Sequence, residues 1–133
     1  MKGYAGRHPS IAFHLLTVIQ KKIDMEKITR FGILMDSDIK IEVILSNLPV
    51  GKTMADIDFS VVFSTANGSL PLAKKDLYTI VDGDDTRYVA CFNSSKVGKG
   101  DVIMTVTANI PDEGFEGGFR KDVVKADTKV TVL

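Results

Sequence analysis

Apolar side chains recur at every second position in several segments of this chain. In residues 57–64 these positions are Ile57, Phe59, Val61 and Phe63. Residues 39–43 and 102–107 repeat the pattern with several β-branched residues. Because successive side chains of a strand point to opposite faces, this period predicts β-strands that bury one face and expose the other.

Clusters of Gly, Pro, Asn, Asp and Ser interrupt these segments at intervals of about ten residues. The strands expected from the alternation and the turns cover residues 39–45, 57–64, 77–81, 87–92, 101–110, 121–125 and 128–133. No helix is expected after residue 28. Roughly seven strands with short connections are typical of an all-β sandwich, which is the fold class that we predict.

The first 27 residues are expected to form an extension, with the sandwich confined to residues 28–133. Residues 11–19 are largely apolar, and they fit either a short helix or a poorly ordered segment. These nine residues are too few to span a membrane, and no small-x-small cleavage site marks a secretory signal. A natural translation start at Met25 would instead make residues 1–24 an upstream extension.

The composition argues against several classes of function. The chain has 133 residues, which is enough for one domain with its own core. Its 17 Lys and Arg residues balance its 17 Asp and Glu residues, so no net positive charge attracts nucleic acid. We therefore expect neither a nucleic-acid partner nor a membrane span.

No group of residues has the spacing of an active site. His8 and His14 both lie in the N-terminal extension, and no Gly-x-Ser-x-Gly motif is present. Cys91, the single cysteine, lies in a strand-like run and is expected to be a small buried residue rather than a reactive thiol. We predict that the protein is not an enzyme and that it uses no cofactor.

The Asp-Gly-Asp-Asp segment at residues 82–85 allows two interpretations. Aspartate-rich turns can bind calcium, but this one lacks the Gly and Glu positions of an EF-hand loop. Asp-Gly is also a common connection between two paired strands. We therefore predict a hairpin turn and no metal site.

The glycine-rich stretch at residues 112–119 carries two phenylalanines, Phe115 and Phe119. It is expected to be a long and flexible loop, in which exposed aromatic rings are costly unless they pack on the core or on a partner. Both alternatives stay open. Phe115, Phe119 and the neighbouring Arg120 are our candidate partner-binding residues.

An ordered series of short motifs runs through roughly the last two-thirds of the chain. It comprises Ile57-Asp58-Phe59, Asp82-Gly83 before Tyr88-Val89, Gly98-Lys99-Gly100, Ile110-Pro111-Asp112, Phe115, Gly117-Gly118, Arg120 and the closing run 128–132. In this order the chain resembles immunoglobulin-like β-sandwich proteins of phage, prophage and conjugative-element clusters, in particular the N-terminal domain of phage baseplate upper proteins. The resemblance implies an immunoglobulin-like antiparallel sandwich with a structural role in a virion or surface assembly. It also implies protein partners, either copies of this chain or other tail and assembly proteins.

Two functions are compatible with these observations. The expected one is a non-catalytic structural or assembly module, and the terminal strand at residues 128–133 is a candidate edge for adding a partner strand. The alternative is a carbohydrate- or cell-surface-binding sandwich. Sugars commonly stack on Trp or Tyr rings, and the chain offers no Trp and three tyrosines, Tyr4, Tyr78 and Tyr88.

Overall fold

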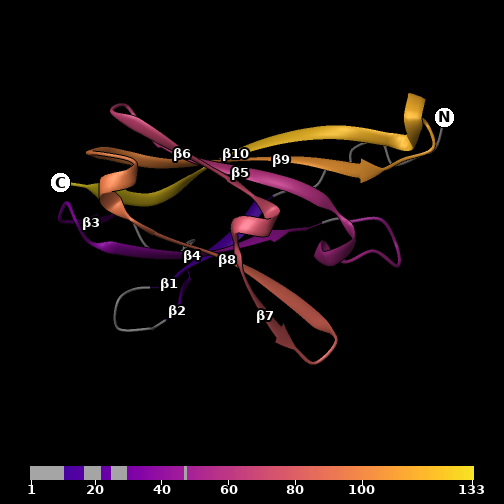
Figure 1. Cartoon of the computed structure of the whole chain (residues 1–133), viewed down its shortest axis with the longest axis horizontal. Coiled ribbons are helices and arrows are strands. Elements are labelled where there is room, and N and C mark those ends of the chain that lie inside the picture. Colours follow the sequence, from indigo (N-terminus) through magenta and orange to yellow (C-terminus); the bar gives the residue numbers. More distant parts are fainter. Residues whose placement is uncertain (1–10, 17–21, 25–29, 47) are drawn as a thin grey trace.

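The computed structural model describes residues 11–16, 22–24, 30–46 and 48–133. These residues form ten strands in two stacked sheets (Figure 1). The strands are β1 (Ile11–Leu16), β2 (Lys22–Asp24), β3 (Phe31–Ile33), β4 (Asp38–Leu45), β5 (Asp58–Thr65), β6 (Gly68–Ala73), β7 (Tyr78–Asp82), β8 (Asp85–Asn93), β9 (Gly100–Pro111) and β10 (Phe119–Val132). Four 3₁₀ turns join them, namely η2 (Met54–Asp56), η3 (Lys74–Asp76), η4 (Ser94–Lys96) and η5 (Glu116–Gly118). The prediction of an all-β sandwich is confirmed.

The strand order identifies the type of sandwich. Sheet I has the order β2-β1-β4-β8-β7, and sheet II has the order β3-β10-β9-β5-β6. Neighbouring strands are antiparallel except β3, which runs parallel to the end of β10. The sets β4-β8-β7 and β10-β9-β5 correspond to the B-E-D and G-F-C strands of an immunoglobulin-like sandwich, and β6 extends the second set at the C′ position.

The inward-facing side chains of both sheets form one hydrophobic core. Those of β5 and β9 are Phe59, Val61, Phe63, Val102, Met104, Val106, Ala108 and Ile110. Two aromatic contacts join the sheets: the ring centroids of Phe63 and Phe92 lie 4.7 Å apart, and those of Phe59 and Tyr88 lie 5.4 Å apart, edge to face. The sequence therefore has a two-residue period because each sheet buries one of its two faces.

The last strand, β10, is continuous where the sequence suggested two strands. Its register with β9 shifts between Asp127 and Thr131, at the polar residues that resembled a break. Lys129 has a left-handed φ of 65°, and its N–H donates to the Asp127 carboxylate at 2.9 Å. The buried Thr128 hydroxyl donates to the Val102 carbonyl at 2.7 Å, so this bulge stays attached to β9.

The helix considered for residues 11–19 is not found in residues 11–16, which form β1. β1 pairs with β4 from Ile11 opposite Leu45 to Leu16 opposite Lys40, and β2 pairs with β1. Both strands thus belong to sheet I of the sandwich, although they lie before residue 28, in the segment predicted to be an extension. The periodicity of a short apolar run fits a strand and a helix equally well. In this chain the pairing of the run with β4 makes it a strand. Residues 1–10, 17–21 and 25–29 lie outside the described residues.

β6 was not predicted from the sequence, because Pro71 interrupts its apolar positions. Proline cannot donate to a sheet ladder, which normally excludes it from central strands. β6 is the edge strand of sheet II, where Pro71 lies opposite Val62 of β5. An edge position is where a sheet tolerates proline.

The terminal strand is not the free edge that its sequence suggested. β3 pairs with residues 130–132 on the side of β10 that faces away from β9. The Leu133 N–H continues this contact by donating to the Ile33 carbonyl at 2.8 Å. The three-residue strand β3, about 100 residues away in the sequence, therefore covers this edge.

Cys91 is exposed, so the expectation of a buried thiol is wrong. The inward positions of β8 belong to Tyr88, Ala90 and Phe92, all of which pack in the core. The alternation of the strand then places Cys91 on the outer face, opposite Lys40 of β4. Because its neighbours in the sequence are apolar, the sequence did not show that Cys91 occupies an outward-facing position of β8.

Candidate functional site

The aromatic loop, residues 112–119, connects β9 to β10 at one end of the sandwich (Figure 1). The N–H groups of Asp112, Phe115 and Gly118 donate to the carbonyls of Gly118, Asp112 and Phe115 at 2.9, 3.3 and 3.0 Å. Gly117 and Gly118 have φ values of 82° and 80°, a region that favours glycine. The glycines thus give the loop a defined turn, in contrast to the flexible loop expected from them.

The Asp112 carboxylate holds this loop together. One of its oxygens accepts from the Gly114 N–H at 2.9 Å, and the other accepts from the Arg120 guanidinium at 2.8 Å. Arg120 also contacts the Asp122 carboxylate at 3.0 Å. The side chains of Arg120 and Asp112 are only 12% and 8% exposed, so solvent screens their ion pair little.

The three predicted partner-binding residues lie together but occupy different environments. Phe115 and Phe119 are 44% and 56% exposed, so neither ring is part of the core. The core-capping alternative therefore does not hold for them. Arg120 is largely buried between Asp112 and Asp122, where it supports the loop that carries the two rings.

A strip of exposed side chains continues from Phe119 along the outer face of β10. The alternation of the strand places Lys121, Val123 and Lys125 on this face. Pro111 of β9 lies opposite Phe119 and extends the apolar area around the ring. The surface next to the loop therefore combines apolar contact area with two cationic groups.

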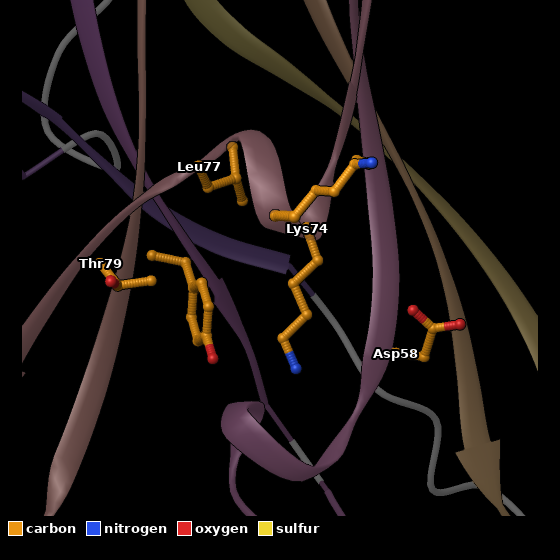
Figure 2. A pocket seen from close by; sticks show the side chains of 7 residues that line it. Asp58, Lys74, Leu77 and Thr79 are labelled. Carbon is orange, nitrogen blue, oxygen red and sulfur yellow. The ribbon is translucent and has the colours of Figure 1, made fainter.

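A pocket with a volume of about 520 Å³ lies at η3, the turn that carries the chain from sheet II to sheet I (Figure 2). Its lining residues are Asp58, Ala73, Lys74, Lys75, Leu77, Thr79 and Tyr88. Five separate elements, β5, β6, η3, β7 and β8, contribute lining residues, which is why no local sequence pattern indicated the pocket.

Lys74 extends into this pocket (Figure 2), but its ammonium group is engaged. The group donates to three carbonyl oxygens, those of Met54, Ala55 and Ile57, at 3.0, 3.0 and 2.7 Å. It also lies 5.4 and 5.2 Å from the ring centroids of Phe59 and Tyr88. An ammonium has three protons, so these carbonyls use all of them. Lys74 therefore supports the fold at the end of η2.

The described tyrosines do not form a platform for stacking a sugar. Tyr88 is buried and its ring meets Phe59 edge to face. Tyr78 is exposed on β7, but it does not line the pocket. Tyr4 lies outside the described residues.

Charged residues of sheet I supply structural contacts. Asp82 and Asp85 pair across a two-residue turn in which Gly83 has a φ of 64°, which confirms the predicted hairpin. The buried Glu42 carboxylate accepts two hydrogen bonds from Arg87, both at 3.2 Å. These hydrogen bonds raise the pKa of Arg87 above its usual value.

Two further observations concern the described part of the chain only. It contains no cluster of three or more His, Cys, Asp or Glu side chains that could hold a metal ion. Nor does it contain a helix whose length and apolar character would suffice to cross a membrane.

The fold and the loop define an immunoglobulin-like sandwich with two exposed aromatic rings at one end. Comparison of the chain with protein-family models, curated proteins and solved structures found no match.

Proposed function

We propose that this protein is a non-catalytic structural module that assembles with a protein partner through the aromatic loop. The observation that carries the proposal is the fixed presentation of two exposed rings, Phe115 and Phe119, on a loop closed by Asp112 and Arg120. Ordering a loop before binding reduces the entropy that association costs. Aromatic side chains in such positions are frequent anchors of protein interfaces.

The surface around the rings indicates the chemistry of the partner. Phe119 and Pro111 would fill an apolar depression on the partner. Lys121 and Lys125 favour carboxylates at the border of that depression. An apolar pocket bordered by acidic residues is therefore the complementary surface. The resemblance to baseplate upper proteins makes a phage tail, a prophage or a mobile-element surface structure the system in which we place this module.

The carbohydrate-binding alternative has less support. It needs exposed aromatic faces that converge on one site, whereas Tyr88 is buried and Tyr78 lies outside the pocket. We therefore retain the assembly module as the proposed function.

Site-specific photo-crosslinking tests this proposal. A photoreactive amino acid replaces Phe115 or Phe119 in the full chain, expressed together with the proteins encoded beside it. Both positions are expected to give a discrete crosslinked product with another protein, because the rings lie at the interface. Since both side chains are exposed, the substitutions should leave the melting temperature unchanged.

Leu34 is the matched control, since it is an exposed apolar residue in the turn between β3 and β4 at the other end of the sandwich (Figure 1). A photoreactive group at this position is expected to give no such product. The same product from Leu34, or no product from either phenylalanine position, would contradict the proposed function.

A further inference from the structure

β7 leaves one edge of sheet I open. It is the last strand of its sheet, and no described strand lies beyond it. The hairpin of β7 and β8 projects away from the rest of the molecule (Figure 1). Tyr78 and Val81, which the alternation places on opposite faces of β7, are 59% and 75% exposed. The open edge thus carries exposed apolar side chains on both faces.

The other three outer strands of the described sheets carry features that discourage pairing. β6 contains Pro71, and β2 and β3 are only three residues long. Short edges, prolines and lysines are the usual means of preventing a new strand from adding to a sheet. β7 has the sequence Tyr-Thr-Ile-Val-Asp, which contains neither proline nor lysine. It is therefore the least protected edge.

The hairpin turn determines which backbone groups of β7 are free. Asp82 and Asp85 close a two-residue turn, and such a closing pair exchanges both of its hydrogen bonds. Hydrogen-bonded and non-hydrogen-bonded pairs then alternate along the two strands. Tyr78 and Ile80 therefore bond to β8, whereas the N–H and C=O groups of Thr79 and Val81 point away from it.

We propose that two copies of this chain pair through β7 in antiparallel orientation, about a two-fold axis at Ile80. In this register Thr79 of one copy lies opposite Val81 of the other, and the symmetry creates this pair twice. Each pair joins outward-facing backbone groups and can exchange two hydrogen bonds. The interface is isologous, so it closes on itself as a dimer.

Neighbouring registers satisfy fewer backbone groups. An axis at Thr79 would place Val81 opposite Leu77, whose N–H already donates to the Lys74 carbonyl at 3.2 Å. An axis at Val81 would place Thr79 opposite Gly83, inside the turn. The axis at Ile80 is therefore the one that pairs the most free backbone groups of β7.

The side chains agree with the same register. The two Ile80 residues face each other as a non-hydrogen-bonded pair, the arrangement in which opposite side chains approach most closely. Tyr78 lies on the same face as Ile80, so each copy adds one exposed ring beside this contact. The dimer thus covers apolar area that the single chain exposes.

Charges at the two ends of β7 favour the antiparallel orientation. The turn after β7 carries Asp82, Asp84 and Asp85, whereas the exposed Lys75 lies just before the strand. Antiparallel pairing places the acidic turn of each copy beside Lys75 of the other, and parallel pairing would place the two acidic turns together. Asp76 accepts from its own Ala73 N–H at 2.9 Å, so it is held within η3.

This surface is separate from the aromatic loop. The β7 hairpin and the loop lie on opposite sides of the molecule in Figure 1. The self-association inferred from β7 therefore does not rest on the partner proposed for Phe115 and Phe119, and a double variant of these two residues should dimerise as the wild type does.

Sedimentation velocity of the full chain tests the dimer. The wild type is expected to sediment as a reversible dimer, and Val81→Pro should weaken it about thirtyfold, because each copy loses one hydrogen-bond donor. The Val81 N–H points away from β8, so the substitution removes no hydrogen bond of the hairpin and the melting temperature should be retained. Val81→Thr keeps the N–H and should dimerise as the wild type does.

Disulfide trapping locates the axis. Opposed residues of a non-hydrogen-bonded pair have Cα atoms about 4.5 Å apart, a distance that a disulfide can bridge. In a Cys91→Ser background, Ile80→Cys should form a linked dimer on oxidation, whereas Leu34→Cys reports random collisions. Three results would each overturn the inference: a monomeric wild type, a Val81→Pro variant with unchanged dimerisation, or equal crosslinking of Ile80→Cys and Leu34→Cys. Loss of the dimer in the Phe115→Ala, Phe119→Ala double variant would overturn it as well and assign the contact to the aromatic loop.

Discussion

Replacing Phe63 with alanine is expected to lower the free energy of unfolding by about 3–5 kcal/mol. Phe63 is fully buried in β5, and its ring contacts Phe92 of the opposite sheet at 4.7 Å between centroids. Removing the ring leaves a cavity between the sheets, which backbone pairing of β5 with β6 and β9 prevents from closing. Equilibrium unfolding in urea measures the loss.

Phe119→Ala is the matched control for this experiment. It removes the same side chain from the surface of β10, where more than half of the residue is exposed. Its expected effect on the free energy of unfolding is within about 0.5 kcal/mol. Equal losses in the two variants would contradict the placement of Phe63 in the core and of Phe119 on the solvent-exposed surface.

Lys74→Met is expected to lower the free energy of unfolding by about 2–3 kcal/mol. The ammonium group of Lys74 donates to three backbone carbonyls and lies against two aromatic rings. Hydrogen bonds from charged groups contribute more than neutral ones, and methionine can replace only the aliphatic stem. Thermal unfolding followed by circular dichroism, together with urea titration, measures the change.

Lys75, the next residue in the chain, provides the control for Lys74→Met. Lys75 is exposed and also lines the pocket, so Lys75→Met should change the free energy of unfolding by no more than about 0.5 kcal/mol. Equal and small effects of the two substitutions would mean that the Lys74 ammonium is free to meet a ligand. That result would reopen the pocket as a binding site.

The two proposed surfaces have a joint consequence. A dimer formed through β7 would present two aromatic loops, one from each copy. A partner that displays repeated binding sites could then engage both loops, and the second contact would be intramolecular. This arrangement suits a module of a symmetric assembly, because a weak single contact becomes strong when it is repeated.

The strands with a two-residue period could be predicted from the sequence because burial of one face dictates that period. Residues 57–64 and 101–110 were placed within one or two positions of β5 and β9. β1 could not be predicted in this way, since an apolar run of this length fits a helix equally well. Its pairing with β4 is a contact between distant segments.

The candidate site was predicted in part. Phe115 and Phe119 were identified because two aromatic rings in a glycine-rich stretch are unusual at the surface. The order of the loop was not predicted, because it depends on the ion pair between Asp112 and Arg120. Arg120 is therefore largely buried beside the loop, whereas the sequence grouped it with the two rings as a partner-binding residue.

The open edge was assigned to the wrong strand, since the sequence does not contain the order of strands in a sheet. The terminal segment looked unprotected, but β3 covers it. β7 looked like an ordinary hairpin strand, and its place at the end of sheet I makes it the free edge.

Backbone relaxation by NMR tests most directly whether the aromatic loop is a fixed contact surface. The order parameters of residues 112–118 in the full chain should be about 0.85, equal to those of β9, and should fall in Asp112→Ala, which removes the hydrogen bonds to Gly114 and Arg120. Values below about 0.6 in the wild type would contradict the account, because the two rings would then have no defined position to offer a partner.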